Sequence, residues 1–403
     1  MVVCLSFQFG RHFWVNSSFL YGLKIDFLSP TLYIQDVLIV ILVFQNIKTI
    51  ADYVYNKRAF VLIFVLLAFI NIIFSISKEA SLFFWIRILE SILLIIILIP
   101  KSQILLHLLE KILPFLLIFQ FILGSFQIIM QKSIGNIFWF FGERSFTILT
   151  PGIAKAMWIG KLFLRPYGTF SHPNSLAGFS LISILILLGK KKQDVLSIIG
   201  IIFGFLLVVL CFSRTVWLAG MVILFIYLFV LRKNKVKYSF WHYLLPLLLA
   251  LALTFLFTKT TIENDSFIFR QKLAEVSLSI IQKYPLFGVG ANNFLIKLSS
   301  ENPIWGQIYF LQPVHNIILL VASELGVFLS LFFSLIILRS LYICWRINRF
   351  LFLSLLAICI TGFFDHYWIT LEQNRLLLIF ILAITFGLSN GKMRKWKKIG
   401  KSA

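Results

Sequence analysis

Charged residues are scarce in this chain: Asp, Glu, Lys and Arg make up 13% of its 403 residues. A soluble domain carries about 25% charged residues, so a chain of this length with half that share has too little polar surface to cover a globule. Hydrophobic residues account for 60% of the sequence, and the mean hydropathy is +0.96. The composition excludes a soluble globular protein and predicts an integral membrane protein.

Acidic residues are the scarcer charged type, with 15 Asp and Glu against 37 Lys and Arg and a formal net charge of +22. In a soluble protein this excess would suggest a nucleic-acid partner. In a membrane protein the positions of the basic residues indicate how the chain is oriented in the membrane, because Lys and Arg concentrate in cytoplasmic loops. We therefore expect membrane lipids as partners and no nucleic acid.

Patterns typical of metal and cofactor sites are also missing. The four cysteines lie far apart and show no disulfide or metal spacing. Glu263 and Asp265 are closely paired carboxylates in a predicted outer loop, but no histidine cluster lies near them. The sequence contains no Walker loop, dinucleotide fingerprint or Gly-x-Ser-x-Gly elbow. We expect neither a metal nor a cofactor.

Long apolar runs are abundant. A helix that crosses the roughly 30 Å hydrocarbon core of a bilayer needs about 17 to 25 mostly apolar residues, and we count about eleven such runs. They lie near residues 32–47, 58–75, 81–99, 112–130, 172–189, 195–211, 216–231, 240–258, 316–338, 350–364 and 376–388. The expected fold class is all-α: a polytopic membrane helix bundle of about 11 to 12 spans that forms one domain over residues 1–403.

The basic residues fall mainly in alternate connections between these runs. About one residue in three is basic in one set of connections and about one in ten in the other. The dense set includes Lys190–Lys192 and the tail 389–403, which places the C-terminus in the cytoplasm. The same count places the N-terminus outside, with residues 1–31 as an interfacial segment or a shortened span.

Two long loops then fall on the outer side, residues 131–171 and 259–315. Loops longer than about 15 residues in a compact protein usually carry function. Within the second loop, Leu273 to Ile281 has helical apolar spacing and predicts an interfacial helix that starts near Arg270. The working surface is therefore expected to face away from the cytoplasm.

Two arginines lie at this outer surface. Arg214 occupies the short turn between two predicted spans, where its planar guanidinium could bind a phosphate bidentately or reach up to lipid headgroups. Arg270 could bind the same kind of ligand or remain a solvated charge.

Histidines and amides lie at three other points on this side: His315-Asn316, His172-Pro173-Asn174 and Asp365-His366. His315 and Asn316 precede a predicted span, where the histidine could act as a general base or form a hydrogen bond at the start of the helix.

Glu324 lies nine residues after His315, on about the opposite face of the helix, so we interpret it as a structural partner. Arg87 and Glu90 share a helix face at i, i+3 and are expected to pair.

The segments around His172-Pro173-Asn174 and Asp365-His366 are also polar. Each could line a polar cavity or merely cap a helix.

Four outer segments together resemble the O-antigen ligase and polymerase family of bacterial envelope proteins. They are Gly168-Thr169-Phe170-Ser171-His172-Pro173-Asn174, Ser213-Arg214-Thr215, Pro285-Leu286-Phe287-Gly288-Val289-Gly290 preceded by Arg270, and His315-Asn316 leading to Glu324-Leu325-Gly326. The resemblance covers about residues 165–385, which would be the catalytic region.

The resemblance implies a C-type membrane glycosyltransferase in the bacterial cytoplasmic membrane, acting as a monomer without a metal. It would move a glycan from a lipid-linked oligosaccharide donor on an isoprenoid diphosphate to a glycan or glycolipid acceptor. Arg214 and Arg270 would hold the diphosphate, and His315 would activate the acceptor hydroxyl. Substrate-binding residues on this reading are Asn316, Gly288, Gly290, His172, Asn174, Asp365 and His366.

Other readings stay open at this point. Within the family, the acceptor could be lipid A core, as in a ligase, or the next repeat unit, as in a polymerase. A solute or bicarbonate transporter could also use about eleven spans with polar residues inside them, although the sequence shows no clear repeat or broken midplane helix. A non-catalytic assembly or lipid-flipping component is a further alternative.

Overall fold

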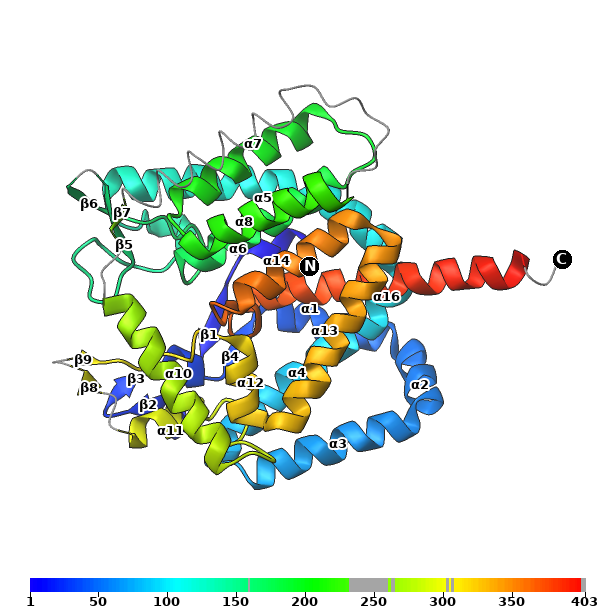
Figure 1. The fold of residues 1–403 in the computed structure, drawn as a ribbon, viewed down its shortest axis with the longest axis horizontal. Helices are drawn as coiled ribbons and strands as arrows, with labels where there is room; N and C mark the ends of the chain where they lie inside the picture. The colour runs from blue at the N-terminus through cyan, green and yellow to red at the C-terminus, as the bar shows by residue number, and fades with distance from the viewer. Residues whose placement is uncertain (159, 232–259, 262–264, 302–303, 306–307, 400–403) are drawn as a thin grey trace.

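The structure is a computed structural model that describes residues 1–158, 160–231, 260–261, 265–301, 304–305 and 308–399. It is mostly helical (Figure 1). The helices are α1 (Ile34–Gln45), α2 (Ile47–Asn56), α3 (Arg58–Ile73), α4 (Lys78–Leu98), α5 (Ser102–Met130), α6 (Pro173–Leu188), α7 (Val195–Leu210), α8 (Arg214–Ile226), α10 (Asp265–Lys283), α11 (Phe294–Ser300), α12 (Ile317–Leu325), α13 (Val327–Ile347), α14 (Arg349–Gly362), α15 (Tyr367–Thr370) and α16 (Glu372–Ile399).

Short antiparallel strands depart from the all-α expectation. They are β1 (Gly10–His12), β2 (Phe19–Leu20), β3 (Leu23–Lys24), β4 (Thr31–Tyr33), β5 (Lys155–Trp158), β6 (Lys161–Leu164), β7 (Thr260–Thr261), β8 (Ile304–Trp305) and β9 (Ile308–Tyr309). The pairs are β1 with β4, β2 with β3, β8 with β9, and the three-stranded order β6-β5-β7. In Figure 1, β5, β6 and β7 lie near the upper end of α10, β2, β3, β8 and β9 lie near α11, and β1 and β4 lie closer to the middle of the view; we call the side that carries them the strand-bearing end.

Several described helices are long and apolar enough to cross a membrane. They are the continuous stretch Lys78–Met130, then Val327–Ile347 and Glu372–Ser389, with the pair Ile34–Gln45 and Ile47–Asn56 as a fourth candidate that is bent by 76°. Five more apolar helices are shorter: Arg58–Ile73, Pro173–Leu188, Val195–Leu210, Arg214–Phe229 and Arg349–Gly362. The expected run 240–258 lies outside the described residues.

Helix α6 lies at the centre of the bundle. Every residue from Pro173 to Leu187 is buried, and the helix contacts α5, α7, α8, α14 and α16. It begins with a proline at its first position, which lacks only an N–H that would find no partner in the helix. By contrast, α3 and α13 carry exposed large apolar side chains such as Phe60, Leu62 and Leu335, as expected of faces that meet lipid.

The expected span 316–338 is wrong as one continuous helix, because the chain breaks at Gly326 between α12 and α13. Gly326 has φ +84°, and a Cβ there would lie 2.1 Å from the carbonyl oxygen of Leu286. The N–H of Val327 donates to the carbonyl of Pro285 (2.9 Å). The 285–290 segment therefore fills the place that a continuing helix would need, and Glu324 lies near the end of a short helix.

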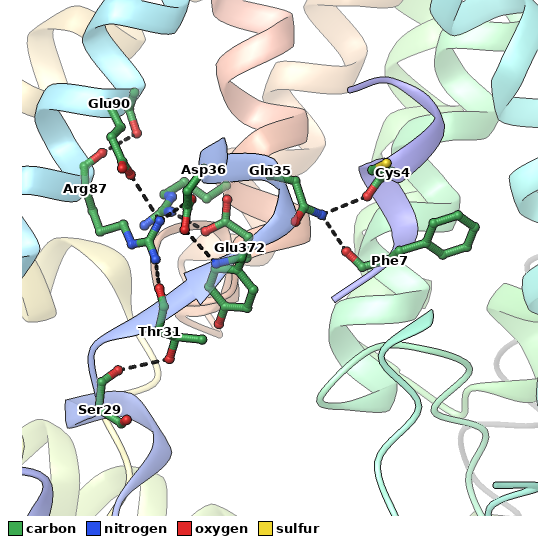
Figure 2. Close-up of polar contacts among 12 residues, drawn as sticks. Cys4, Phe7, Ser29, Thr31, Gln35, Asp36, Arg87, Glu90 and Glu372 are labelled. Carbon is green, nitrogen blue, oxygen red and sulfur yellow. Dashed lines mark hydrogen bonds and ion pairs between the residues drawn. The ribbon is translucent and has the colours of Figure 1, made fainter. Parts of the chain in front are cut away.

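The N-terminal residues form strands and short 3₁₀ turns that enter the bundle. Gly10 pairs with Tyr33 where β1 meets β4, and the side-chain amide of Gln35 donates to the carbonyls of Cys4 and Phe7 (2.9 and 2.6 Å; Figure 2). Leu5 is fully buried in the core. This segment is an integral part of the packing.

A group of charges beside this segment links α1, α4 and α16. Arg87 and Glu90 pair as expected (3.0 Å), and Arg87 also contacts Asp36 and the carbonyl of Thr31 (Figure 2). Glu372 lies close by and contacts Arg375. We call Asp36, Arg87, Glu90, Glu372 and Arg375 the Arg87 cluster.

Candidate functional site

Three chain segments that are distant in sequence meet at the candidate site. His172 precedes α6, His315 precedes α12, and Asp365 and His366 lie between α14 and α15. Contacts among these segments bring together polar residues that lie far apart in the sequence. We call His315, Asp365 and His366 the histidine–aspartate cluster.

The cluster is tightly arranged. His315 Nδ1 lies 3.4 Å from Asp365 Oδ1, and the His315 side chain is 15% exposed against 6% for Asp365. The His315 and His366 rings are 5.2 Å apart between centroids. Within the described part of the chain, these three residues form a group whose ligand atoms all lie within 4.8 Å of one another, close enough to hold one metal ion.

Asp365 is held by a chain of hydrogen bonds that ends on a buried arginine. Asn174 Nδ2 donates to Asp365 Oδ2 (3.0 Å), and Arg165 Nη2 donates to Asn174 Oδ1 (2.6 Å). Arg165 Nε also donates to the carbonyl of Cys211 (2.8 Å). Asp365 Oδ2 is thereby fixed by the amide, while Oδ1 accepts the backbone N–H of His366 (2.8 Å) and lies 3.4 Å from His315 Nδ1.

The electrostatics of the cluster favour an ionised aspartate. Burial alone would raise the pKa of Asp365, but its contact with His315 and the nearby His366 and Arg270 hold that pKa well below its usual range. Burial lowers the pKa of His366 to about 3, which Asp365 only partly opposes. The site therefore contains one carboxylate and a neutral His366 near neutral pH.

The two arginines singled out in the sequence lie differently. Arg270 is in α10, and its charge acts on both Asp365 and His366. Helix α10 starts at Asp265, so Arg270 lies within it and not at its start as expected. Arg214 opens α8, three residues after the Cys211 carbonyl that binds Arg165.

The loop before His172 is fixed by glutamine side chains. Gln120 binds Thr169, both through the N–H (3.0 Å) and through the hydroxyl (2.7 Å). Gln127 accepts the N–H groups of Tyr167 and Gly168 (2.9 and 2.8 Å). Gly168 has φ +56°, a conformation that strains other residues, and a Cβ there would lie 2.1 Å from the Gln120 side-chain oxygen.

His172 and Asn316 both act as helix caps. His172 Nδ1 accepts the N–H of Asn174 (3.1 Å) at the start of α6. Asn316 Oδ1 accepts the N–H of Leu319 (3.0 Å) at the start of α12, and its Nδ2 donates to the carbonyl of Phe363 (3.1 Å). The second bond ties the His315 segment to the segment that carries Asp365.

Gly288 and Gly290 make backbone contacts with the rest of the protein. The N–H of Gly290 donates to the carbonyl of Glu324 (3.0 Å), and a Cβ on Gly288 would lie 2.4 Å from the Glu324 backbone. Their expected substrate contacts stay a prediction. Glu324 accepts the N–H of Phe294 (3.1 Å), which agrees with the prediction that Glu324 is a structural partner.

Sequence reasoning missed two residues of the site. Arg165 comes just before the Gly168–Asn174 motif, and a basic residue beside that motif could have been noticed. Phe27 packs edge-on against His366 (5.5 Å between centroids), and Asn292 Nδ2 donates to the Phe27 carbonyl (3.2 Å). Nothing distinguished Phe27 among 45 phenylalanines.

Comparison with known proteins agrees with the sequence resemblance. A family model described as O-antigen ligase matches residues 199–334, a range that includes Arg214, Arg270 and His315. No curated protein matches the chain. The matched range covers residues 199–334 of the 403, and it supports the resemblance to the O-antigen ligase and polymerase family, whose members are membrane glycosyltransferase-like enzymes.

Proposed function

We propose that this protein transfers a glycan from an isoprenoid diphosphate carrier to an acceptor hydroxyl. The strand-bearing end would face away from the cytoplasm, and the C-terminus would lie inside the cell. The observation that carries the proposal is the His315–Asp365 pair (3.4 Å) beside Arg270, within a chain that matches the family. A base, an orienting carboxylate and a cation are the groups that such a transfer needs.

His315 is the proposed general base. With a proton on Nδ1 shared with Asp365, the imidazole presents Nε2 as the acceptor of the substrate proton. Nε2 now lies 3.3 Å from Gln312 Oε1, and an acceptor hydroxyl would take the place of that amide. Asp365 would hold the ring in orientation and stabilise the imidazolium that forms, the role that a carboxylate has beside a catalytic histidine in other enzymes.

The transfer is a single displacement. The acceptor oxygen forms a bond to the anomeric carbon, the bond from that carbon to the carrier diphosphate breaks, and the hydroxyl proton passes to His315. Attack opposite the leaving group inverts the anomeric configuration. Arg214 and Arg270 would stabilise the charge on the departing diphosphate, so no metal is needed for this step.

Replacement of His315 is the direct test. We expect His315→Ala to lower transfer from a purified lipid-linked glycan by about 10²- to 10⁴-fold, the range for loss of a general base. His107→Ala is the matched control, because His107 is an exposed histidine on α5. Transfer at the parental rate by His315→Ala would refute the assignment of the base.

The same assay separates ligase from polymerase. Lipid-linked repeat units given alone would be elongated by a polymerase, whereas a ligase would form product only after a glycolipid acceptor is added.

A further inference from the structure

We propose that Zn²⁺ binds His315, Asp365 and His366, and that transfer stops while the ion is bound. The ligand atoms of the three side chains lie within 4.8 Å of one another, and His315 Nδ1 is 3.4 Å from Asp365 Oδ1. A tetrahedral zinc ion with bonds of about 2.0 to 2.2 Å separates its ligand atoms by about 3.4 Å. This pair therefore already has the spacing of two zinc ligands.

Hydrogen bonds around His366 leave a lone pair for the metal. When the Thr370 hydroxyl donates to the His366 carbonyl (3.2 Å), its oxygen accepts from His366 Nδ1 (2.7 Å). With Nδ1 protonated, Nε2 of the neutral ring carries the free lone pair. Ligating histidines generally have their second nitrogen bonded in this way, which fixes tautomer and orientation.

His315 can adopt the matching tautomer. If its Nε2–H donates to Gln312 Oε1 (3.3 Å), the lone pair of Nδ1 faces Asp365 Oδ1. A lone pair and a carboxylate at this distance repel each other unless a cation lies between them. Either a proton on Nδ1 or a metal ion satisfies the pair.

Other charges set the strength of binding. Asp365 supplies the one negative charge of the three ligands, while Arg165 and Arg270 both act on Asp365 and oppose a second cation. The other Asp365 oxygen already accepts from Asn174. We expect an exchangeable ion with open coordination positions, in contrast to a closed structural zinc site.

Zinc and catalysis need His315 in different forms. The base requires a proton on Nδ1 and a free Nε2, whereas the metal occupies Nδ1 and leaves the proton on Nε2. Binding would therefore withdraw both the base and its orienting carboxylate. This inhibition rests on the proposed function, but the binding does not.

Binding is tested on the full chain purified in detergent, by calorimetry with ZnCl₂ and by visible absorption with CoCl₂. We expect one ion per chain, lost in His366→Ala and Asp365→Asn and kept in His107→Ala. Thr370→Val preserves side-chain shape but removes the bond to His366, and it should weaken binding about 10- to 100-fold, as loss of an outer-shell partner does. Equal affinity in Thr370→Val and the parent would overturn the proposal, as would the absence of binding.

Inhibition is tested in the transfer assay. ZnCl₂ at its measured binding concentration should stop transfer, and a chelator should restore it. MgCl₂ at the same concentration should have no effect through this site, because Mg²⁺ prefers oxygen ligands, although it binds diphosphates. Zinc that binds but leaves transfer unchanged would overturn the proposal. A preparation without transfer still reports binding, so failure of the proposed function is distinguishable.

Discussion

Two groups of buried charges in this protein use their carboxylates in different ways. In the Arg87 cluster, arginines touch carboxylates directly: Arg87 contacts Asp36 and Glu90, and Arg375 contacts Glu372. At the site, Asn174 lies between Arg165 and Asp365, so guanidinium and carboxylate are bridged by an amide. The carboxylates of the Arg87 cluster face an arginine, whereas Asp365 directs Oδ2 at the Asn174 amide and Oδ1 at both the backbone N–H of His366 and the His315 ring.

The largest effect on transfer should come from removing the charge of Asp365. We expect Asp365→Asn to lower transfer by about 10²- to 10⁴-fold, because the His315 proton would no longer be held on the nitrogen that faces this residue. Initial rates and membrane-inserted protein should be measured together. Asp52→Asn is the matched control on the exposed helix α2. A rate within twofold of the parent would show that His315 needs no orienting carboxylate.

A smaller effect should follow if the bridge is converted into a direct ion pair. Asn174→Asp places a carboxylate against Arg165, in the manner of the Arg87 cluster, and beside the negative Asp365. The repulsion and the lost amide donor should cost about 1.5 to 3 kcal/mol at Asp365, roughly a 10- to 100-fold loss of transfer. Asn56→Asp, at the end of the exposed α2, is the control. Unchanged transfer would mean that the amide bridge has no functional role.

The smallest effect on transfer per folded molecule should come from the Arg87 cluster. Arg87→Met leaves Asp36 and Glu90 without their cation, and removal of one partner of a buried pair costs about 3 to 5 kcal/mol of stability. Unfolding in detergent should shift accordingly, with partial rescue by Arg87→Lys. Transfer per folded molecule should fall less than tenfold. A loss as large as that of Asp365→Asn would show that this cluster also takes part in the reaction.

Much of the bundle could be predicted, because helices that contact lipid need long apolar runs, and such runs are recognisable in the sequence. The runs near residues 58–75, 195–211 and 350–364 correspond to α3, α7 and α14 within a few residues. The break at Gly326 could not be predicted, since a glycine in an apolar run is usually tolerated. Its cause is the carbonyl of Leu286, forty residues earlier.

The same limit applies to the site. His315, His366 and Asp365 stand out as polar residues at the ends of apolar runs, so the sequence marks them. Which of them meet depends on tertiary contacts such as Asn174 with Asp365, which are 191 residues apart. Arg165 and Phe27 also belong to the site through tertiary contacts, so the sequence alone did not identify them.

The buried carbonyl of Ser6 has a consequence for how the protein is made. It accepts the side-chain amide of Gln373 across 367 residues (3.1 Å) and also contacts Thr169. A chain emerging during synthesis can insert its early helices, but this contact must wait until α16 has been produced. Contacts over such separations form slowly. The loop that precedes His172 therefore reaches its final support only at the end of synthesis, and incomplete chains would remain inactive.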